Sequence, residues 1–238
     1  MKTKIIFAAT VLLLSVGQPS HAQSRIASDA FDVTEFQEVN ANTLANIYIT
    51  QSDTPAVRAE GSEDLLNRLE VEIKNGVLFL TMDKRYFKRL GRKSKKLDIY
   101  IATPLLSKIS SEGVGNIRIN DAFSTPALVI SSDGVGNITA EALSSPSIRI
   151  SSDGVGNITL GGTADNVKIE SEGVGNIRTE KLKAKSIIVK SDGVGNVSCF
   201  ASESIKIHAN GLGNVTYYGS PTHKEIHKDG LGKVREGK

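Results

Sequence analysis

The sequence predicts an all-β protein: a single-domain parallel β-helix or solenoid with coils of about 20 residues, capped by an upstream β half. Three observations predict this class. A glycine-rich pentapeptide recurs at a nearly constant spacing, β-branched residues stand at fixed positions on both sides of it, and polar and apolar residues alternate around those positions. Trp is absent while glycine is plentiful, which favours tight repeated turns over a helical bundle.

The first 22 residues have the features of a secretory signal. Lys2 and Lys4 precede an apolar run over 5–16, and the tripeptide Ser-His-Ala at 20–22 has the small–x–small pattern of a cleavage site. The apolar run is shorter than the roughly 20 residues of a transmembrane helix. We therefore expect an exported protein of the periplasm or the cell surface, with no transmembrane segment in the mature chain.

The mature chain is expected to be one continuous unit. It has 216 residues (238 minus 22), which fits one domain, and we divide it into a β half at 23–103 and the repeats at 104–238. The only cysteine, Cys199, lies far from the cleavage point. We therefore expect neither a lipoprotein anchor nor an intramolecular disulfide.

The upstream half also has strand patterns. The sequence predicts strands over 46–50, 56–60, 69–73, 77–80 and 97–101. Asn75-Gly76 between two alternating runs indicates a two-residue hairpin, and 63–68 fits one helical turn. We expect this half to form the first coils and to cover the open edge of the solenoid, which would otherwise invite strand addition.

The repeat consists of five corners of the type acid-Gly-Val-Gly-Asn and two weaker copies, Asn-Gly-Leu-Gly-Asn at 210–214 and Asp-Gly-Leu-Gly-Lys at 229–233. Their first glycines are Gly113, Gly134, Gly154, Gly173, Gly193, Gly211 and Gly230. The spacing of 18 to 21 residues between them is too short for a four-stranded propeller blade, which needs about 40. Each unit is instead predicted to be one coil, made of a strand, a corner, a second strand and a looser return.

Isoleucine and valine flank every corner at the same distance. Four residues before the first glycine stand Ile109, Ile130, Ile150, Ile169, Val189, Ile207 and Ile226, and four residues after it stand Ile117, Ile138, Ile158, Ile177, Val197, Val215 and Val234. One unit of 20 residues cannot bury its own apolar face. Stacked units, about 4.8 Å apart, bury one continuous column of these side chains.

The corner residues are predicted to be structural. Glycine fits positions where backbones of adjacent coils approach closely, and the Val or Leu between the glycines is expected to turn inward and fill the corner. The asparagine amides are expected to bond from coil to coil as a ladder of Asn116, Asn137, Asn157, Asn176, Asn196 and Asn214. A dinucleotide loop is not expected, because it needs a third glycine and a following helix.

One acidic residue opens each of the first five corners. These residues are Glu112, Asp133, Asp153, Glu172 and Asp192, with Asn210 and Asp229 in the same register. Stacked carboxylates repel one another by a little under about 1 kcal/mol per pair in water. Two hypotheses follow: a Ca²⁺ ion offsets the repulsion, or each carboxylate accepts hydrogen bonds from the amides of its own corner. No other cofactor is expected.

Basic residues are concentrated in one stretch. They are Lys84, Arg85, Lys88, Arg89, Arg92, Lys93, Lys95 and Lys96. The formal charge of +3 becomes +1 without Lys2 and Lys4, so the mature chain outside these eight residues carries −7. The stretch is predicted either to attract an anionic glycan, lipopolysaccharide or another acidic surface, or to be a solvated loop joining two coils. Export excludes nucleic acid as the partner.

Histidine and cysteine give weaker signals. His208 and His227 each stand three residues before a first glycine, so they are expected to stack on adjacent coils. A zinc site there lacks an evident third ligand. Cys199 shares a register with buried positions of other coils and is expected to be a small apolar core residue.

The repeated acid-Gly-Val-Gly-Asn-Ile units resemble the head GIN domain family of auto-transporter adhesins, as does the upstream half from Val33 to Ile101 with its ending Ile-Ala-Thr-Pro-Leu at 101–105. The resemblance covers nearly all of the mature chain. It implies a right-handed β-helix-like fold on exported proteins of Bacteroidetes-type bacteria, and it implies adhesion without catalytic residues.

These observations favour a non-catalytic exported protein that binds, adheres or supports the bacterial envelope, with a glycan, lipopolysaccharide or an envelope protein as partner. Solenoids present long regular faces that suit extended ligands. One alternative is an enzyme acting on polysaccharide, which would need paired carboxylates at one groove, whereas the acids here are spread over the coils. A second alternative is a structural solenoid that binds cations along its acid column.

Overall fold

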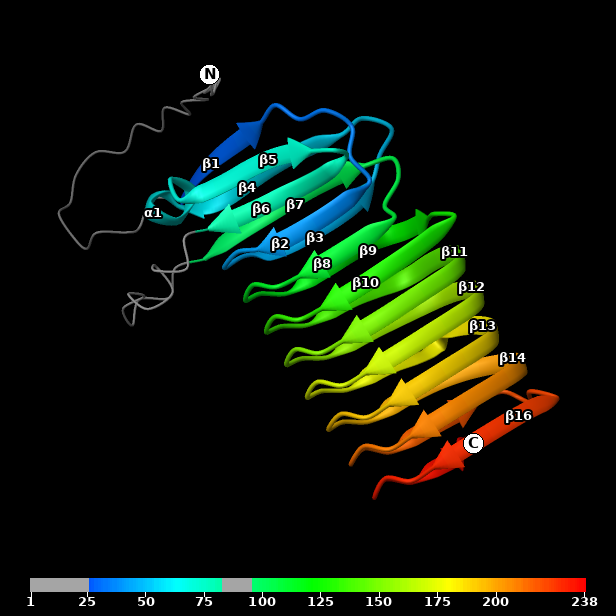
Figure 1. Ribbon diagram of the computed structural model, residues 1–238. Coiled ribbons are helices and arrows are strands. Elements are labelled where there is room, and N and C mark those ends of the chain that lie inside the picture. Colours follow the sequence, from blue (N-terminus) through cyan, green and yellow to red (C-terminus); the bar gives the residue numbers. More distant parts are fainter. Residues whose placement is uncertain (1–25, 83–95) are drawn as a thin grey trace, which may run out of the picture.

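The computed structural model describes residues 26–82 and 96–238. Strands make up 68% of the structure and helix 2%, which confirms the predicted all-β class. In Figure 1 the strands stack as the coils of a rod, and every repeat coil turns sharply at one edge of the rod and bends more gradually at the opposite edge. We call the edge with the sharp turns the corner edge and the opposite edge the bend edge.

The elements follow the predicted order. The upstream half contains β1 (Ile26–Phe31), β2 (Glu38–Asn42), β3 (Asn46–Gln51), β4 (Ala56–Ser62), α1 (Glu63–Leu66), β5 (Leu69–Lys74), β6 (Val77–Met82) and β7 (Leu97–Thr103). The repeats contain β8 (Lys108–Ser111), β9 (Ile117–Ser124), β10 (Ala127–Ser132), β11 (Ile138–Ser152), β12 (Ile158–Ser171), β13 (Ile177–Ser191), β14 (Val197–Ala209), β15 (Val215–Tyr218), β16 (His223–Lys228) and β17 (Val234–Glu236).

Coils of the repeat pair in parallel and in register. Ile130 of β10 lies between Ile109 of β8 and Ile150 of β11, and the pairing continues to β16. Ile138 of β11 lies between its equivalents in β9 and β12 in the same way. The predicted columns of β-branched residues are therefore continuous.

These columns form the core of the rod. From Ile109 to Val215, every residue of the two columns is at most 2% exposed. Full burial of one such side chain is worth roughly 1.5–3 kcal/mol, so stacking supplies the stability that a single coil lacks. The last coil has a neighbour on one side within the described residues, and its Ile226 is 40% exposed.

The upstream half continues the stack and then closes it. Strands β2 and β3 pair in parallel with β8 and β9, and β6 and β7 add the next coil on top of them. Beyond these, β5 pairs antiparallel with β6, while β4 pairs antiparallel with β7 and with β1. The antiparallel strands cover the N-terminal edge of the stack, as expected.

The local predictions in this half are confirmed. All five predicted strands are present, and Asn75 and Gly76 connect β5 to β6 with φ of 52° and 76°. Two successive positive φ angles are those of a type I′ turn, whose twist matches that of the flanking strands. The predicted helical turn is the short helix α1.

Candidate binding surfaces on the two edges of the solenoid

The corner edge is built by backbone contacts between coils. The amide of Val135 donates to the carbonyl of Gly113 at 2.9 Å, and the amide of Gly136 donates to the carbonyl of Val155 at 3.0 Å. Each corner therefore bonds to the coil on either side. A Cβ atom added to Gly156 would overlap the backbone of Gly136. The glycines are required because the stacked backbones leave no room for a side chain.

Asparagine side chains follow the corners as a ladder. The Oδ1 atom of Asn137 accepts the Nδ2–H of Asn157 at 2.9 Å and the backbone N–H of the same residue at 3.0 Å. The same pair of bonds joins Asn46, Asn116, Asn137, Asn157, Asn176, Asn196 and Asn214 in sequence. In the last coil Lys233 replaces the asparagine, and its backbone N–H donates to Asn214 Oδ1 at 2.9 Å.

The expectation that the residue between the two glycines fills the corner is wrong. Val155 and Val174 are each 52% exposed, because the closely stacked glycine backbones occupy the inside of the corner. The side chains point outward in every corner of the repeat. We call this row the apolar ridge; it consists of Val114, Val135, Val155, Val174, Val194, Leu212 and Leu231.

Neighbouring side chains contact four of the five residues of the acid column, and Lys190 is the cation among the partners found in the described part of the chain. Lys190 Nζ lies 3.1 Å from Glu172 and 2.9 Å from Asp192. Asn40 and Asn42 donate to Glu112, Ser131 donates to Asp133, and Asn210 donates to Asp192. The corner amides are engaged by carbonyl groups of adjacent coils, so the hypothesis that they satisfy the carboxylates is wrong.

Asp153 lies at the centre of the acid column. Burial raises the pKa of its carboxyl group, and the charges of Asp133 and Glu172 raise it further. Within residues 26–82 and 96–238, no three His, Cys, Asp or Glu side chains are placed to hold one metal ion. A calcium site along Glu112, Asp133, Asp153, Glu172 and Asp192 remains a prediction.

The basic stretch lies in the sequence between β6 and β7. Lys84, Arg85, Lys88, Arg89, Arg92, Lys93 and Lys95 lie outside the described residues. The flanking Lys96 lies 2.7 Å from Asp98 and lines a small hollow beside Val114, the first residue of the apolar ridge. The attraction of this stretch to an anionic surface remains a prediction.

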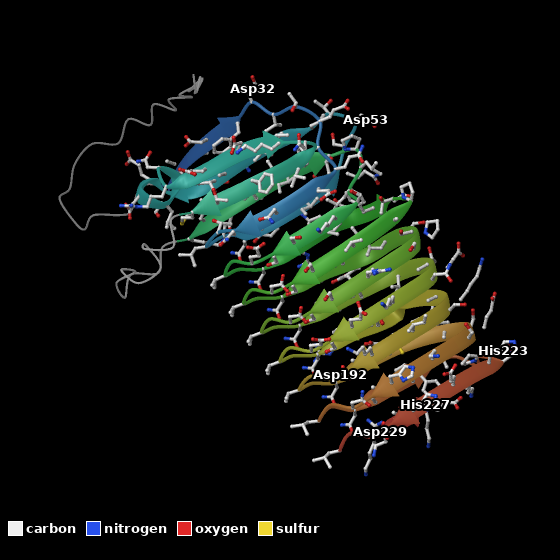
Figure 2. The ribbon with its side chains drawn as sticks, in the orientation of Figure 1. Asp32, Asp53, Asp192, His223, His227 and Asp229 are labelled. Atoms are coloured by element: carbon white, nitrogen blue, oxygen red, sulfur yellow. The ribbon has the colours of Figure 1, made fainter. Side chains whose placement is uncertain are left out.

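The remaining candidates are packing residues. Cys199 is fully buried, and burial raises the pKa of its thiol to about 12, so the thiol stays protonated and unreactive at neutral pH. His208 and His227 stack with ring centroids 5.1 Å apart, as expected. Figure 2 shows Asp192 and Asp229 at the corner edge, and His223 at the other end of β16.

Sequence reasoning missed a groove on the bend edge. It encloses about 470 Å³ and crosses β11, β12, β13 and β14. Its lining combines hydroxyl groups, a charged pair and one aromatic ring: Ser144, Ser145, Pro146, Thr163, Ala164, Asp165, Lys183, Ala184, Lys185, Phe200 and Ser202. These residues stand about one coil apart in the sequence, so only the stacked register brings them together.

Two contacts organise the groove. Lys183 Nζ lies 3.8 Å from the centre of the Phe200 ring, and Lys185 Nζ lies 2.7 Å from Asp165. Hydrogen bonding to Asp165 raises the pKa of Lys185, so this ammonium group is charged at neutral pH. The groove therefore presents two ammonium groups, one carboxylate and several hydroxyls on a shallow surface, which suits recognition of a polar polymer.

The structure has no helix among its described residues that is long and apolar enough to cross a membrane.

Comparison with known proteins gives a consistent result. The family model described as "Putative auto-transporter adhesin, head GIN domain" matches residues 35–221. A crystal structure of a putative adhesin from Bacteroides fragilis is 35% identical, covers 90% of this chain and 98% of its own, and superposes with a TM-score of 0.86. Comparison with curated proteins gave no match.

More distant structures share the fold. A putative adhesin from Parabacteroides distasonis is 18% identical with a TM-score of 0.68, and it covers 90% of this chain and 98% of its own. A protein of the same organism described as a putative lipid binding protein is 20% identical with a TM-score of 0.67, and it covers 90% of this chain and 97% of its own. None of these descriptions names an enzyme.

Proposed function

The chain belongs to the head GIN domain family of putative auto-transporter adhesins, and we propose that it is an exported, non-catalytic binding protein that holds an acidic polysaccharide of the bacterial envelope. The ligand lies along the bend edge, in the groove across β11 to β14, and the basic stretch at residues 84–96 attracts it. The protein acts in the periplasm or at the cell surface, after cleavage of the predicted signal at 1–22.

The groove is the observation that carries this proposal. It crosses four strands of consecutive coils, so a linear polymer running along the rod can contact several coils at once. Lys183 and Lys185 supply positive charge, and Ser144, Thr163 and Ser202 supply hydroxyl groups that donate to or accept from sugar hydroxyls. Contacts of this kind are weak singly and add up along a polymer.

Both edges carry acidic residues. The corner edge carries the acid column, while in the bends Lys181, Lys183 and Lys185 alternate with acids such as Glu141, Asp165 and Glu180. The described residues together carry 19 Lys or Arg and 25 Asp or Glu, a net −6, and residues 83–95 carry seven basic residues and one acid, a net +6. An anionic polymer is therefore attracted to residues 83–95 more strongly than to the rest of the chain.

The chemistry of the groove supports binding without hydrolysis. Glycoside hydrolysis uses two carboxyl groups placed about 5–10 Å apart on either side of one bond. The groove lining contains one carboxylate, Asp165, and Lys185 holds it in an ion pair at 2.7 Å. The carboxylates of the acid column lie on the other edge of the rod, beside the apolar ridge.

Retention on immobilised lipopolysaccharide and on columns of acidic and neutral polysaccharides tests the proposal. The wild-type protein is expected to be retained by at least one acidic matrix and to elute with salt. Neutralising the basic residues at 84–96, or replacing Lys183 and Lys185 by Ser, is expected to reduce that retention. Unchanged retention in both variants contradicts the proposal, and new reducing ends released from any polysaccharide support the enzyme alternative.

A further inference from the structure

The apolar ridge stands out among the exposed positions of the repeat. All seven of its residues are Val or Leu, and they are between 48% and 85% exposed. Other outward positions change their chemistry from coil to coil. One such register reads Lys108, Val129, Arg149, Lys168, Ile188, Lys206 and Glu225. Only at the ridge does every coil keep an aliphatic side chain facing water.

Stacking of the coils does not explain this choice. The bonds between corners use the backbone N–H and C=O groups of the ridge residues, which every amino acid except proline supplies. Threonine has the same branched shape as valine and equally suits strands. A contiguous exposed apolar row instead marks a surface that is covered in the working protein.

The regular spacing of the ridge residues along the rod limits which partners can contact all of them. Its residues follow one another at the spacing of hydrogen-bonded strands, about 4.8 Å, because Val114, Val135, Val155, Val174 and Val194 are joined by parallel bridges. A protein partner that contacts every ridge residue in the same way must carry the same repeat along its axis. We propose that the apolar ridge is a contact surface between two copies of this chain, lying side by side and parallel.

The flanks of the ridge fix the parallel orientation. One flank is the acid column and the other is the asparagine ladder, in which each amide of residues 116 to 214 uses one of its two N–H groups within the ladder. A two-fold axis along the rod places the acid flank of each copy beside the amide flank of the other. At the last corner it places Asp229 on the same side as the other copy's Lys233.

The antiparallel orientation is disfavoured by charge. A two-fold axis across the rod would place both acid columns on one side of the contact, with carboxylates facing carboxylates. The central residue Asp153 already has a raised pKa because of burial and because of its neighbours Asp133 and Glu172, so further negative charge there is unfavourable.

The size of the surface sets the strength of the contact. Seven ridge residues span about 29 Å, and five residues cover at most about 16 Å even when fully extended, so a sharp corner is narrower. The area per copy is therefore below about 450 Å², which is smaller than the roughly 800 Å² per partner of a stable complex. The association is therefore weak, reversible and dependent on concentration. It leaves the groove of the bend edge free, so it stands independently of the proposed ligand.

Sedimentation equilibrium of the purified protein tests the contact. The wild type is expected to self-associate at high concentration. The triple variant Val135→Thr, Val155→Thr, Val174→Thr is expected to associate at least tenfold more weakly with an unchanged unfolding midpoint. Ile188→Thr is the matched control, because Ile188 is 45% exposed but lies outside the ridge; it is expected to associate like the wild type. A wild type that stays monomeric, or a triple variant that associates equally well, overturns the proposal.

Cysteine cross-linking tests the orientation. In a parallel pair, Val114→Cys and Val174→Cys each lie near their own counterpart and form a disulfide between copies under mild oxidation. The buried Cys199 does not compete. In an antiparallel pair only the central Val174→Cys cross-links, and this result overturns the parallel arrangement. Binding of the wild type, but not of the triple variant, to phosphatidylcholine vesicles without self-association overturns the proposal in favour of a lipid surface.

Discussion

The two edges of the rod differ in how regularly their coils stack. At the corner edge the same five-residue pattern recurs seven times, and neighbouring backbones lie so close that glycine is the only residue that fits. At the bend edge the register shifts between Ala140 and Leu143 in one pair of coils and between Thr179 and Ala184 in another. The comparison teaches that the repeated motif builds the scaffold, while the edge whose sequence varies contains the groove proposed to bind the ligand.

This difference has a physical origin. At the corners, backbone amides of one coil donate to backbone carbonyls or asparagine Oδ1 atoms of adjacent coils, so an extra residue or side chain in one coil breaks the bonds of its neighbours. At the bends, side chains such as Lys183 and Asp165 face solvent and contact the next coil only through their tips. The bends therefore tolerate the variation that a specific binding surface needs.

The largest expected loss of stability comes from a substitution that disrupts a corner. In Gly175→Ala the new Cβ would overlap the backbone of Gly156, and φ of 153° is already unfavourable for a side chain. We expect a loss of about 4 kcal/mol in the free energy of unfolding, measured by urea titration. The matched change at the bend edge, Ser147→Ala, is expected to alter it by at most about 0.5 kcal/mol. Equal effects would remove the distinction between the edges.

A smaller loss of stability is expected from a substitution in the asparagine ladder. Asn157→Ala removes the acceptor of both the side-chain and the backbone N–H of Asn176. We expect a loss of about 1–3 kcal/mol, because a backbone donor is left without its partner. Asn166 is an exposed asparagine near the bend with no side-chain hydrogen bond among the described residues. Asn166→Ala is expected to leave the unfolding midpoint unchanged in the same urea titration.

The smallest effects concern pH and have opposite signs at two neighbouring acids. Asp153 has a raised pKa, so its charge destabilises the folded protein at neutral pH, and this cost is lost as pH falls through the folded pKa. Glu170 has a pKa lowered by the Lys168 ammonium 2.7 Å away, so its charge stabilises the fold above the unfolded pKa.

Thermal unfolding of Asp153→Asn and Glu170→Gln measures these signs. The first variant is expected to be slightly more stable than the wild type at pH 7, and the second slightly less stable. The difference for Asp153→Asn is expected to disappear as the pH falls through the raised folded pKa of Asp153, and the difference for Glu170→Gln as the pH falls below the unfolded pKa and through the lowered folded pKa of Glu170. Shifts of the same sign at pH 7 would contradict the opposite contributions of these two charges.

The scaffold could be predicted from the sequence because each of its structural features has a local sequence pattern. The columns of Ile and Val, the Asn75-Gly76 hairpin and the glycine corners each depend on residues close together in the chain. The orientation of Val155 could not be predicted by extending the alternation of the strands through the corner. The alternation stops there because the stacked glycine backbones fill the inside.

The groove was missed because it has no local signature. Its lining comes from four successive coils, as shown by Ser144, Thr163, Lys183 and Phe200. Lys183 and Phe200 contact each other only because the register shifts after Thr179. A signal was present: aligning the coils by their corners places Lys183 and Phe200 near the same bend. The partners of the acid column were missed for a similar reason, since Lys190 reaches carboxylates on two coils.

A glycan array comparing the wild type with the variant Lys183→Ser, Lys185→Ser tests the central claim most directly, namely that the bend edge binds the ligand. Both lysines are exposed, so the variant is expected to unfold at the wild-type midpoint. The account predicts that the wild type binds a set of acidic glycans and that the variant loses it. Identical binding profiles for the two proteins would contradict the account.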